Sequence, residues 1–77
     1  MQLRTVNKTL SQYGIKAKLY NNRSYFYFWG DDVEAAPTTS VYVPRLNDLT
    51  LDQWMMYAQE FVQLSRNRME EISLRDH

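Results

Sequence analysis

One short run of aromatic residues constrains the fold most tightly: residues 25–29 read Tyr-Phe-Tyr-Phe-Trp. In a β-strand, successive side chains point to opposite faces, so the phenylalanines share one face and the tyrosines and tryptophan share the other. Phenylalanine has no polar group to satisfy and suits a core, whereas tyrosine and tryptophan tolerate a wet surface. The run therefore predicts a sheet with one covered face and one exposed face.

Hydrophobic residues that alternate with polar ones predict two further strands, at residues 16–20 and 39–43. Turn-forming residues at 21–24 join the first strand to the aromatic strand as a β-hairpin, and Pro44 ends the third strand because it lacks an N–H. Apolar residues at helical spacing predict a helix over residues 3–13. Gly14 follows it, at the position where a residue in the left-handed conformation commonly caps the C-terminus of a helix. Residues 33–38 show no periodicity and are expected to form an acidic loop.

The start of the last helix has the clearest local pattern. Thr50 and Gln53 have the spacing of a capping box, and Leu49 and Trp54 have the spacing of a hydrophobic staple. Apolar residues then mark one helical face over residues 51–73. Such a helix is about 35 Å long, whereas the expected radius of gyration is only about 11 to 12 Å. Its far end is therefore expected to overhang, fray or pack on another molecule.

These elements predict a single α+β domain over residues 1–77, in the order α-β-β-β-α. We expect a three-stranded antiparallel sheet with two helices on one face and a long C-terminal helix. The chain has no cysteine, so its stability must come from packing without a disulfide. No apolar run approaches the roughly 20 residues of a membrane span, and the polar N-terminus lacks a signal-peptide core, so we expect a cytoplasmic protein with no membrane partner.

Charge is unevenly distributed along the chain although nine basic and nine acidic residues cancel. Residues 1–30 hold five basic residues and no acidic one, and residues 31–77 have a net charge of −5. Whether this separation persists in space depends on how the strands pair.

The sequence offers little for catalysis. It has no cysteine, its only histidine is His77, and no glycine-rich phosphate loop or metal-ligand spacing is present. Asp31, Asp32 and Glu34 form the one acidic cluster, but they lack the alternating ligand pattern of a calcium loop, so a solvated loop is the simpler interpretation. We expect no enzymatic activity, no metal and no cofactor.

The exposed sheet face is the stronger candidate for function. If the hairpin loop has an even number of residues, one face gathers two lysines and four aromatic residues, and Tyr42 becomes the fifth aromatic residue if Val41 and Val43 point inward. Such a surface suits single-stranded nucleic acid, which stacks on aromatic side chains, but equally a protein interface or a homodimer face. Cross-strand pairs that only stabilise the sheet are a further interpretation. The residues of this face are Lys16, Lys18, Tyr20, Tyr25, Tyr27, Trp29 and Tyr42.

Two segments, residues 25–32 (YFYFWGDD) and residues 40–54 (SVYVPRLNDLTLDQW), resemble short proteins from the accessory regions of tailed phages and prophages. The resemblance covers about residues 6–54, and the helix beyond Leu64 departs from it. It implies a protein that acts by binding and blocking a host protein, as inhibitors of CRISPR and other defence systems do, often through an acidic surface that imitates DNA. Residues that could supply such a surface are Asp31, Asp32, Glu34, Asp48 and Asp52.

Together these patterns predict a non-enzymatic phage-type accessory protein that binds, and by the resemblance inhibits, a host protein. A single-stranded nucleic-acid-binding protein that uses the aromatic and lysine face is the first alternative. A homodimer formed through the sheet face or through the C-terminal helix is the second.

Overall fold

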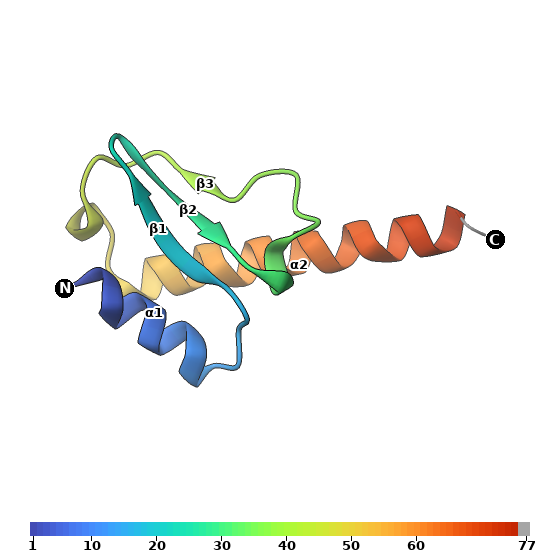
Figure 1. Ribbon diagram of the computed structural model, residues 1–77, viewed down its shortest axis with the longest axis horizontal. Helices are drawn as coiled ribbons and strands as arrows, with labels where there is room; N and C mark the ends of the chain where they lie inside the picture. Colours follow the sequence, from blue (N-terminus) through green and yellow to red (C-terminus); the bar gives the residue numbers. More distant parts are fainter. Residues whose placement is uncertain (76–77) are drawn as a thin grey trace.

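The computed structural model describes residues 1–75 and confirms the order α-β-β-β-α (Figure 1). The sheet is antiparallel with strand order β1-β2-β3, and short 3₁₀ turns η1 and η2 flank the third strand. The fold is therefore α+β, as predicted. The elements are α1 (Leu3–Gln12), β1 (Lys18–Asn22), β2 (Tyr25–Trp29), η1 (Asp31–Val33), β3 (Ser40–Val41), η2 (Leu46–Asp48) and α2 (Leu51–Arg75).

The hairpin between β1 and β2 closes with a two-residue loop, Arg23 and Ser24, because Asn22 pairs with Tyr25. Arg23 adopts a positive φ of 51°, which two-residue hairpin turns require. Strand β1 begins and ends two residues later than the predicted range of 16–20. Pairing with β2 extends it through Asn22 despite the low strand propensity of asparagine. A shift by two residues leaves every side chain on its predicted face.

The third strand is shorter than the predicted 39–43. Only Ser40 and Val41 pair with β2, and the Val43 N–H instead donates to the Val41 carbonyl oxygen at 3.1 Å. This tight turn takes the chain out of the ladder before Pro44, which has no N–H to offer. Val41 is nonetheless buried and Val43 half-buried, so Tyr42 points outward as predicted.

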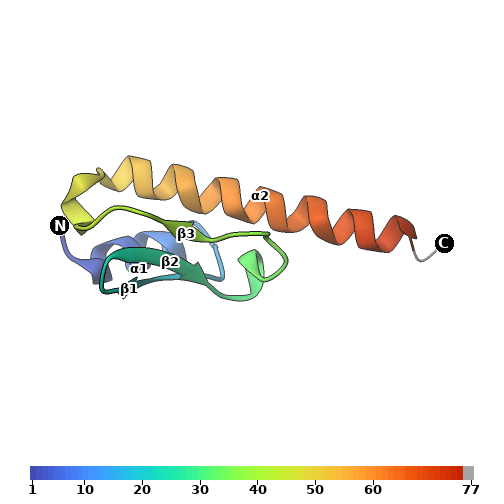
Figure 2. The same cartoon turned by 90° about the horizontal axis from the view of Figure 1, so that it is seen from above.

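The core lies between the sheet and α2, which crosses its inner face as a separate layer (Figure 2). Trp54 is fully buried at its centre. Its ring meets the rings of Phe26 and Phe28 edge-to-face, with centroids 5.2 and 6.3 Å apart, and its Nε1–H donates to the Leu46 carbonyl oxygen at 2.9 Å. The predicted inward face of β2 is therefore the main wall of the core.

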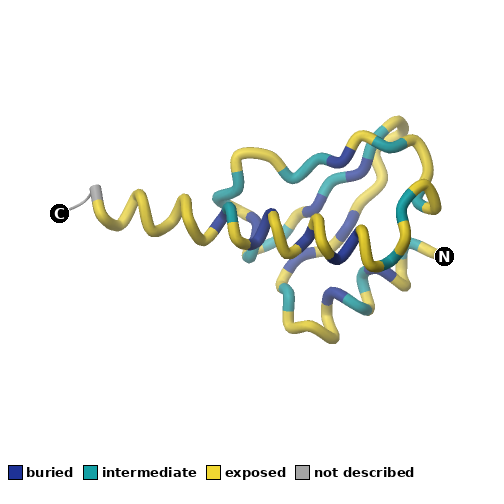
Figure 3. Tube along the Cα trace, turned by 180° about the vertical axis from the view of Figure 1, so that it is seen from behind, coloured by how far each residue is buried: buried dark blue, intermediate teal, exposed yellow. Residues whose placement is uncertain are grey.

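Both ends of α2 follow from its sequence. Thr50 and Gln53 form the predicted capping box, with reciprocal bonds of 2.9 and 3.2 Å between backbone N–H groups and side-chain oxygens. At the other end the helix runs past the sheet, so that Met69 and Ile72 are exposed although they continue the buried stripe (Figure 3). The molecule is consequently 46 Å long and 26 Å wide. The predicted overhang is confirmed.

The first helix packs on the core and also protects the edge of the sheet. Val6 and Leu10 are fully buried, and α1 lies alongside β1 (Figure 1). Asn7 faces the unpaired edge of that strand: its Oδ1 accepts from the Leu19 N–H at 2.6 Å, and its Nδ2 donates to the Leu19 carbonyl oxygen at 3.2 Å. One side-chain amide thus replaces a neighbouring strand, which is how an edge can be closed to further pairing.

Replacing Asn7 with alanine is expected to lower the free energy of unfolding by about 1–3 kcal/mol, because a partly buried N–H and C=O of Leu19 lose their partners. Urea unfolding followed by circular dichroism measures the loss. The matched control is Lys8→Ala, an exposed neighbour on the same helix, which should change stability by less than about 0.5 kcal/mol. Equal effects of the two substitutions would show that the edge contact contributes nothing.

Candidate functional site

The outer face of the sheet gathers the aromatic residues predicted for it. Phe26 and Phe28 are buried, while the alternate residues of β2 are exposed or half-buried. Lys16 precedes β1 and is exposed at its start. We call the outer face the aromatic surface, and it consists of Lys18, Tyr20, Tyr25, Tyr27, Trp29 and Tyr42.

Four tyrosines form a continuous row from β1 across β2 to Tyr42, the residue that follows β3. The rings of Tyr20 and Tyr27 are stacked, with centroids 5.4 Å apart and planes 19° apart. Tyr25 lies next, 6.3 Å from Tyr27 and 5.5 Å from Tyr42, in tilted arrangements. The rings therefore cover part of each other's faces, the Tyr25 hydroxyl accepts from Nδ2 of Asn22 at 2.7 Å, and Tyr42 is still 78% exposed.

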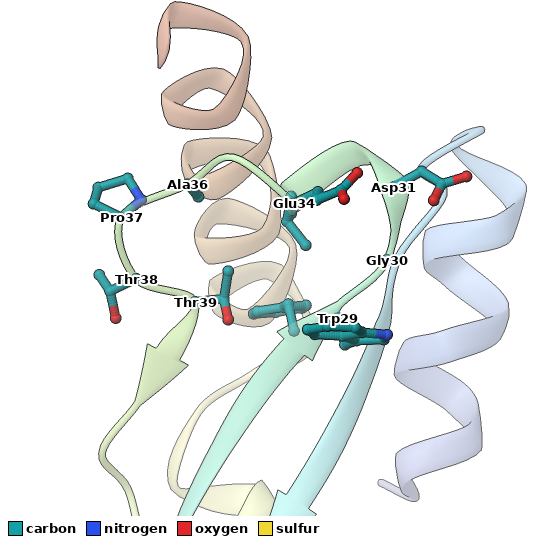
Figure 4. A pocket seen from close by; sticks show the side chains of 10 residues that line it. Trp29, Gly30, Asp31, Glu34, Ala36, Pro37, Thr38 and Thr39 are labelled. Atoms are coloured by element: carbon teal, nitrogen blue, oxygen red, sulfur yellow. The ribbon is translucent and has the colours of Figure 1, made fainter. Parts of the chain in front are cut away.

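Trp29 ends β2 opposite Lys18 and is 69% exposed. It lies between two hollows. One, of about 280 Å³, opens toward η1 and the segment 36–39, and Asp31 and Glu34 contribute to its lining (Figure 4). The other, of about 450 Å³, opens toward α1 and is lined in part by Lys16 and Lys18. The indole thus separates an acidic hollow from a basic one.

The backbone around the acidic hollow is held from both sides. Gly30, with φ 152° and ψ 176°, turns the chain out of β2 where it approaches the backbone of Lys16 and Ala17 closely. Beyond η1, the Ala35 N–H donates to the Oγ of Ser65 on α2 at 3.1 Å, and this serine is buried. These contacts fix the position of η1 relative to Trp29.

The five acidic residues predicted to form one surface lie in two groups. The first group is Asp31 and Asp32 in η1 and Glu34 directly after it; the next residue, Ala35, bonds to Ser65 of α2. The second group is Asp48 in η2 and Asp52 at the start of α2. Asp52 precedes Ser65 by thirteen residues, or about 20 Å of helix. The loops do flank β3, but at its opposite ends, so these residues form no continuous patch.

Two of these carboxylates satisfy backbone donors. Asp32 accepts from the Lys16 N–H at 2.7 Å, and Asp48 accepts from the Arg45 N–H at 3.1 Å as part of the capping box of η2. Asp52 lies in the first turn of α2, where a negative charge is favourable. Local structure therefore accounts for these three, and only Asp31 and Glu34 border a hollow on the sheet's outer side.

The uneven charge of the sequence is partly retained in space. All five basic residues of the first half belong to α1, β1 or the segments beside them, so they lie on the side of the molecule away from β3. The acidic residues among residues 1–75 lie in η1, directly after it, in η2 and in α2. The two sets meet at the start of β1, where Asp32 accepts from the Lys16 N–H at 2.7 Å and Asp31 lines the same hollow as Lys16 and Lys18, so the separation is only partial.

Sequence reasoning missed the residues that complete the acidic hollow, namely Ala36, Pro37, Thr38 and Thr39. The Phe28 N–H donates to the Thr39 carbonyl oxygen at 3.0 Å and brings this segment beside β2. The only available indication was the predicted start of the third strand at residue 39, which implies pairing near the end of β2.

Comparison of the chain with models of known protein families, with curated proteins and with solved structures gave no match. Within residues 1–75, no group of three or more histidine, cysteine, aspartate or glutamate side chains is placed to hold a metal ion. No helix in that range is long and apolar enough to cross a membrane. His77, the single histidine, lies outside the described residues.

Proposed function

We propose that the protein is a non-enzymatic interaction module that binds a protein partner through the aromatic surface. The observation that carries this proposal is the gathering of four tyrosines and one tryptophan on a sheet face that no element within residues 1–75 covers (Figure 2). Tyrosine and tryptophan supply large contact areas at low conformational-entropy cost and dominate the energetics of protein interfaces.

The ring geometry favours a protein over single-stranded nucleic acid. Bases stack on open ring faces, but the stacked pair Tyr20–Tyr27 and the tilted contacts of Tyr25 cover part of those faces. Asp31 and Glu34 beside Trp29 would also repel a phosphate backbone at that end of the surface. Tyrosine and tryptophan side chains packed side by side instead suit a partner that offers apolar side chains and hydrogen-bonding groups.

The resemblance to phage and prophage accessory proteins supports a host protein, such as a component of a defence complex, as the class of partner. The resemblance implies an acidic surface, for which the sequence offers residues at both ends of β3. Because the acidic residues lie in two groups, we propose the aromatic surface as the binding site in its place.

Affinity capture from nuclease-treated lysate of the source cells tests this proposal. The wild-type chain is compared with a Trp29→Ser, Tyr42→Ser double variant, in which two largely exposed side chains are lost and the fold is preserved. We expect retention of one protein to fall at least about tenfold, since interface hot spots contribute ~2 kcal/mol or more each. Substitution of Met56 with serine removes an exposed side chain of α2 instead and should leave retention unchanged.

Other results would identify the alternatives. Nucleic-acid binding predicts that the captured material is lost when the lysate is treated with nuclease, and that an oligonucleotide quenches Trp29 fluorescence at low salt. These two results together would contradict the proposal. Retention of a second copy of the chain alone, with a melting temperature that rises with protein concentration, would establish a homodimer. Equal retention by the wild type and the double variant would exclude the aromatic surface as the binding site.

A further inference from the structure

The acidic hollow beside Trp29 has features that the aromatic surface does not explain. It is a pocket of about 280 Å³, small beside the roughly 300–1,000 Å³ of pockets for drug-sized ligands. Its size suits one side chain of a partner. The indole of Trp29 forms one wall, the η1 turn with Asp31 and Glu34 forms another, and residues 36–39 close the far side (Figure 4).

The chemistry of this lining points to a cation. An exposed indole attracts a cationic group to its face, and a carboxylate forms short, charge-assisted hydrogen bonds with the same group. The pocket has one such ring and the carboxylate of Glu34, whereas Asp31 lies at its rim, with a side chain directed toward α1 and the neighbouring hollow, which it also lines (Figure 4). Unlike Asp32 and Asp48, whose carboxylates accept backbone N–H groups, Asp31 and Glu34 are exposed at the pocket.

The walls are held in place before any ligand arrives. Val33 buries its side chain in the core beneath η1, and the Ala35 N–H is bonded to Ser65 of α2. On the far side, the bond from the Phe28 N–H to the Thr39 carbonyl oxygen holds the other wall beside β2. A pocket with fixed walls loses little conformational entropy when a side chain enters it.

We propose that this pocket binds the guanidinium group of an arginine side chain, presented by the protein partner. Arginine suits the lining better than lysine, because its planar group stacks on an aromatic ring while its N–H groups reach a carboxylate at the edge. The guanidinium group would stack on the indole of Trp29, Glu34 would accept its hydrogen bonds, and Asp31 at the rim would add negative charge. This inference rests on the proposed function and names the chemistry of the partner at one end of the aromatic surface.

The test uses a small probe and needs no partner. Nα-acetyl-arginine amide is added to the isotope-labelled full chain, and the two indole N–H signals are followed by NMR. The signal of Trp29 should shift and saturate in the millimolar range, whereas that of Trp54, which is buried and bonded to Leu46, should not move. Nα-acetyl-citrulline amide is the matched control, because it is planar and of similar size but uncharged, and it should bind at least about tenfold more weakly.

The carboxylates are tested in the same titration. An Asp31→Asn, Glu34→Gln double variant should weaken arginine binding by about tenfold or more, since charged hydrogen bonds are lost. Glu60→Gln, which removes an exposed carboxylate on α2, should leave binding unchanged. Overlapping backbone amide signals of the variants and the wild type, away from the substitutions, verify the fold.

Three results would overturn the inference: no saturable shift of the Trp29 signal, equal binding of the arginine and citrulline probes, or undiminished binding by the Asp31→Asn, Glu34→Gln variant. None of these three results changes the outcome that the proposed function predicts for the capture experiment. If the probe fails while capture still depends on Trp29 and Tyr42, the arginine pocket is wrong and the aromatic surface stands. If the probe binds while capture is independent of those residues, the proposed function fails alone.

Discussion

Replacing Trp54 with alanine is expected to lower the free energy of unfolding by about 3–5 kcal/mol, a large part of the roughly 4–12 kcal/mol that a domain of this length has. The indole is fully buried, contacts the rings of Phe26 and Phe28 edge-to-face and donates to the Leu46 carbonyl oxygen. Its removal leaves a cavity between the two layers and takes from the Leu46 carbonyl oxygen the shorter of its two hydrogen bonds, the other being accepted from the Leu49 N–H at 3.4 Å. Urea unfolding followed by circular dichroism measures the change.

The chain provides a matched control in its second tryptophan. Trp29→Ala removes the same side chain from the exposed face, where it is 69% accessible, and should change stability by no more than about 1 kcal/mol. A loss below about 1 kcal/mol for Trp54→Ala, or equal losses for the two variants, would contradict the assignment of Trp54 to the centre of the core.

Gly30→Ala is expected to destabilise the protein by about 3 kcal/mol or more. With φ at 152° and ψ at 176°, Gly30 occupies a backbone region that is essentially restricted to glycine, which alone costs another residue about 1–3 kcal/mol. A β-carbon would also lie 2.7 Å from the Cα of Ala17 and closer still to the Lys16 carbonyl oxygen. Both obstacles are backbone atoms that no side-chain rotation can move.

Gly14→Ala is the control for this prediction. Gly14 also has a positive φ, 71°, but nothing lies within 4 Å of the position of a β-carbon there. It ends α1 in a Schellman motif, with the Gly14 N–H bonded to Ser11 and the Ile15 N–H to Leu10. The cost should be about 1 kcal/mol. Similar losses in the two variants, compared by chemical denaturation, would show that close packing at Gly30 is unimportant.

Alternation and helix capping made most of the fold predictable. The inward and outward faces of the hairpin depend only on the parity of its loop, and the two-residue loop keeps the parity that was assumed. The start of α2 was predictable because Thr50 and Gln53 act within one turn. Such features depend on neighbours in the sequence and need no knowledge of tertiary contacts.

The missed features depend on contacts between distant segments. Nothing near Asn7 indicates that its amide pairs with Leu19, twelve residues away, and nothing near Ala35 indicates the bond to Ser65. The division of the acidic residues into two groups was missed for the same reason, because the distance between η1 and η2 is set by tertiary packing. The pocket beside Trp29 likewise depends on the hydrogen bond from the Phe28 N–H to the Thr39 carbonyl oxygen.

Photo-cross-linking from the sheet tests most directly whether the aromatic surface contacts a protein partner. The photoreactive residue p-benzoylphenylalanine is placed at Tyr42 in one variant and at Met56 in the other, two positions of comparable exposure, 78% and 67%, on the sheet and on α2. Both chains are irradiated in nuclease-treated lysate, and the adducts are identified by mass spectrometry. We expect one protein to be joined to the chain from position 42 and not from position 56. An adduct from position 56 alone, or none from position 42, would contradict the account.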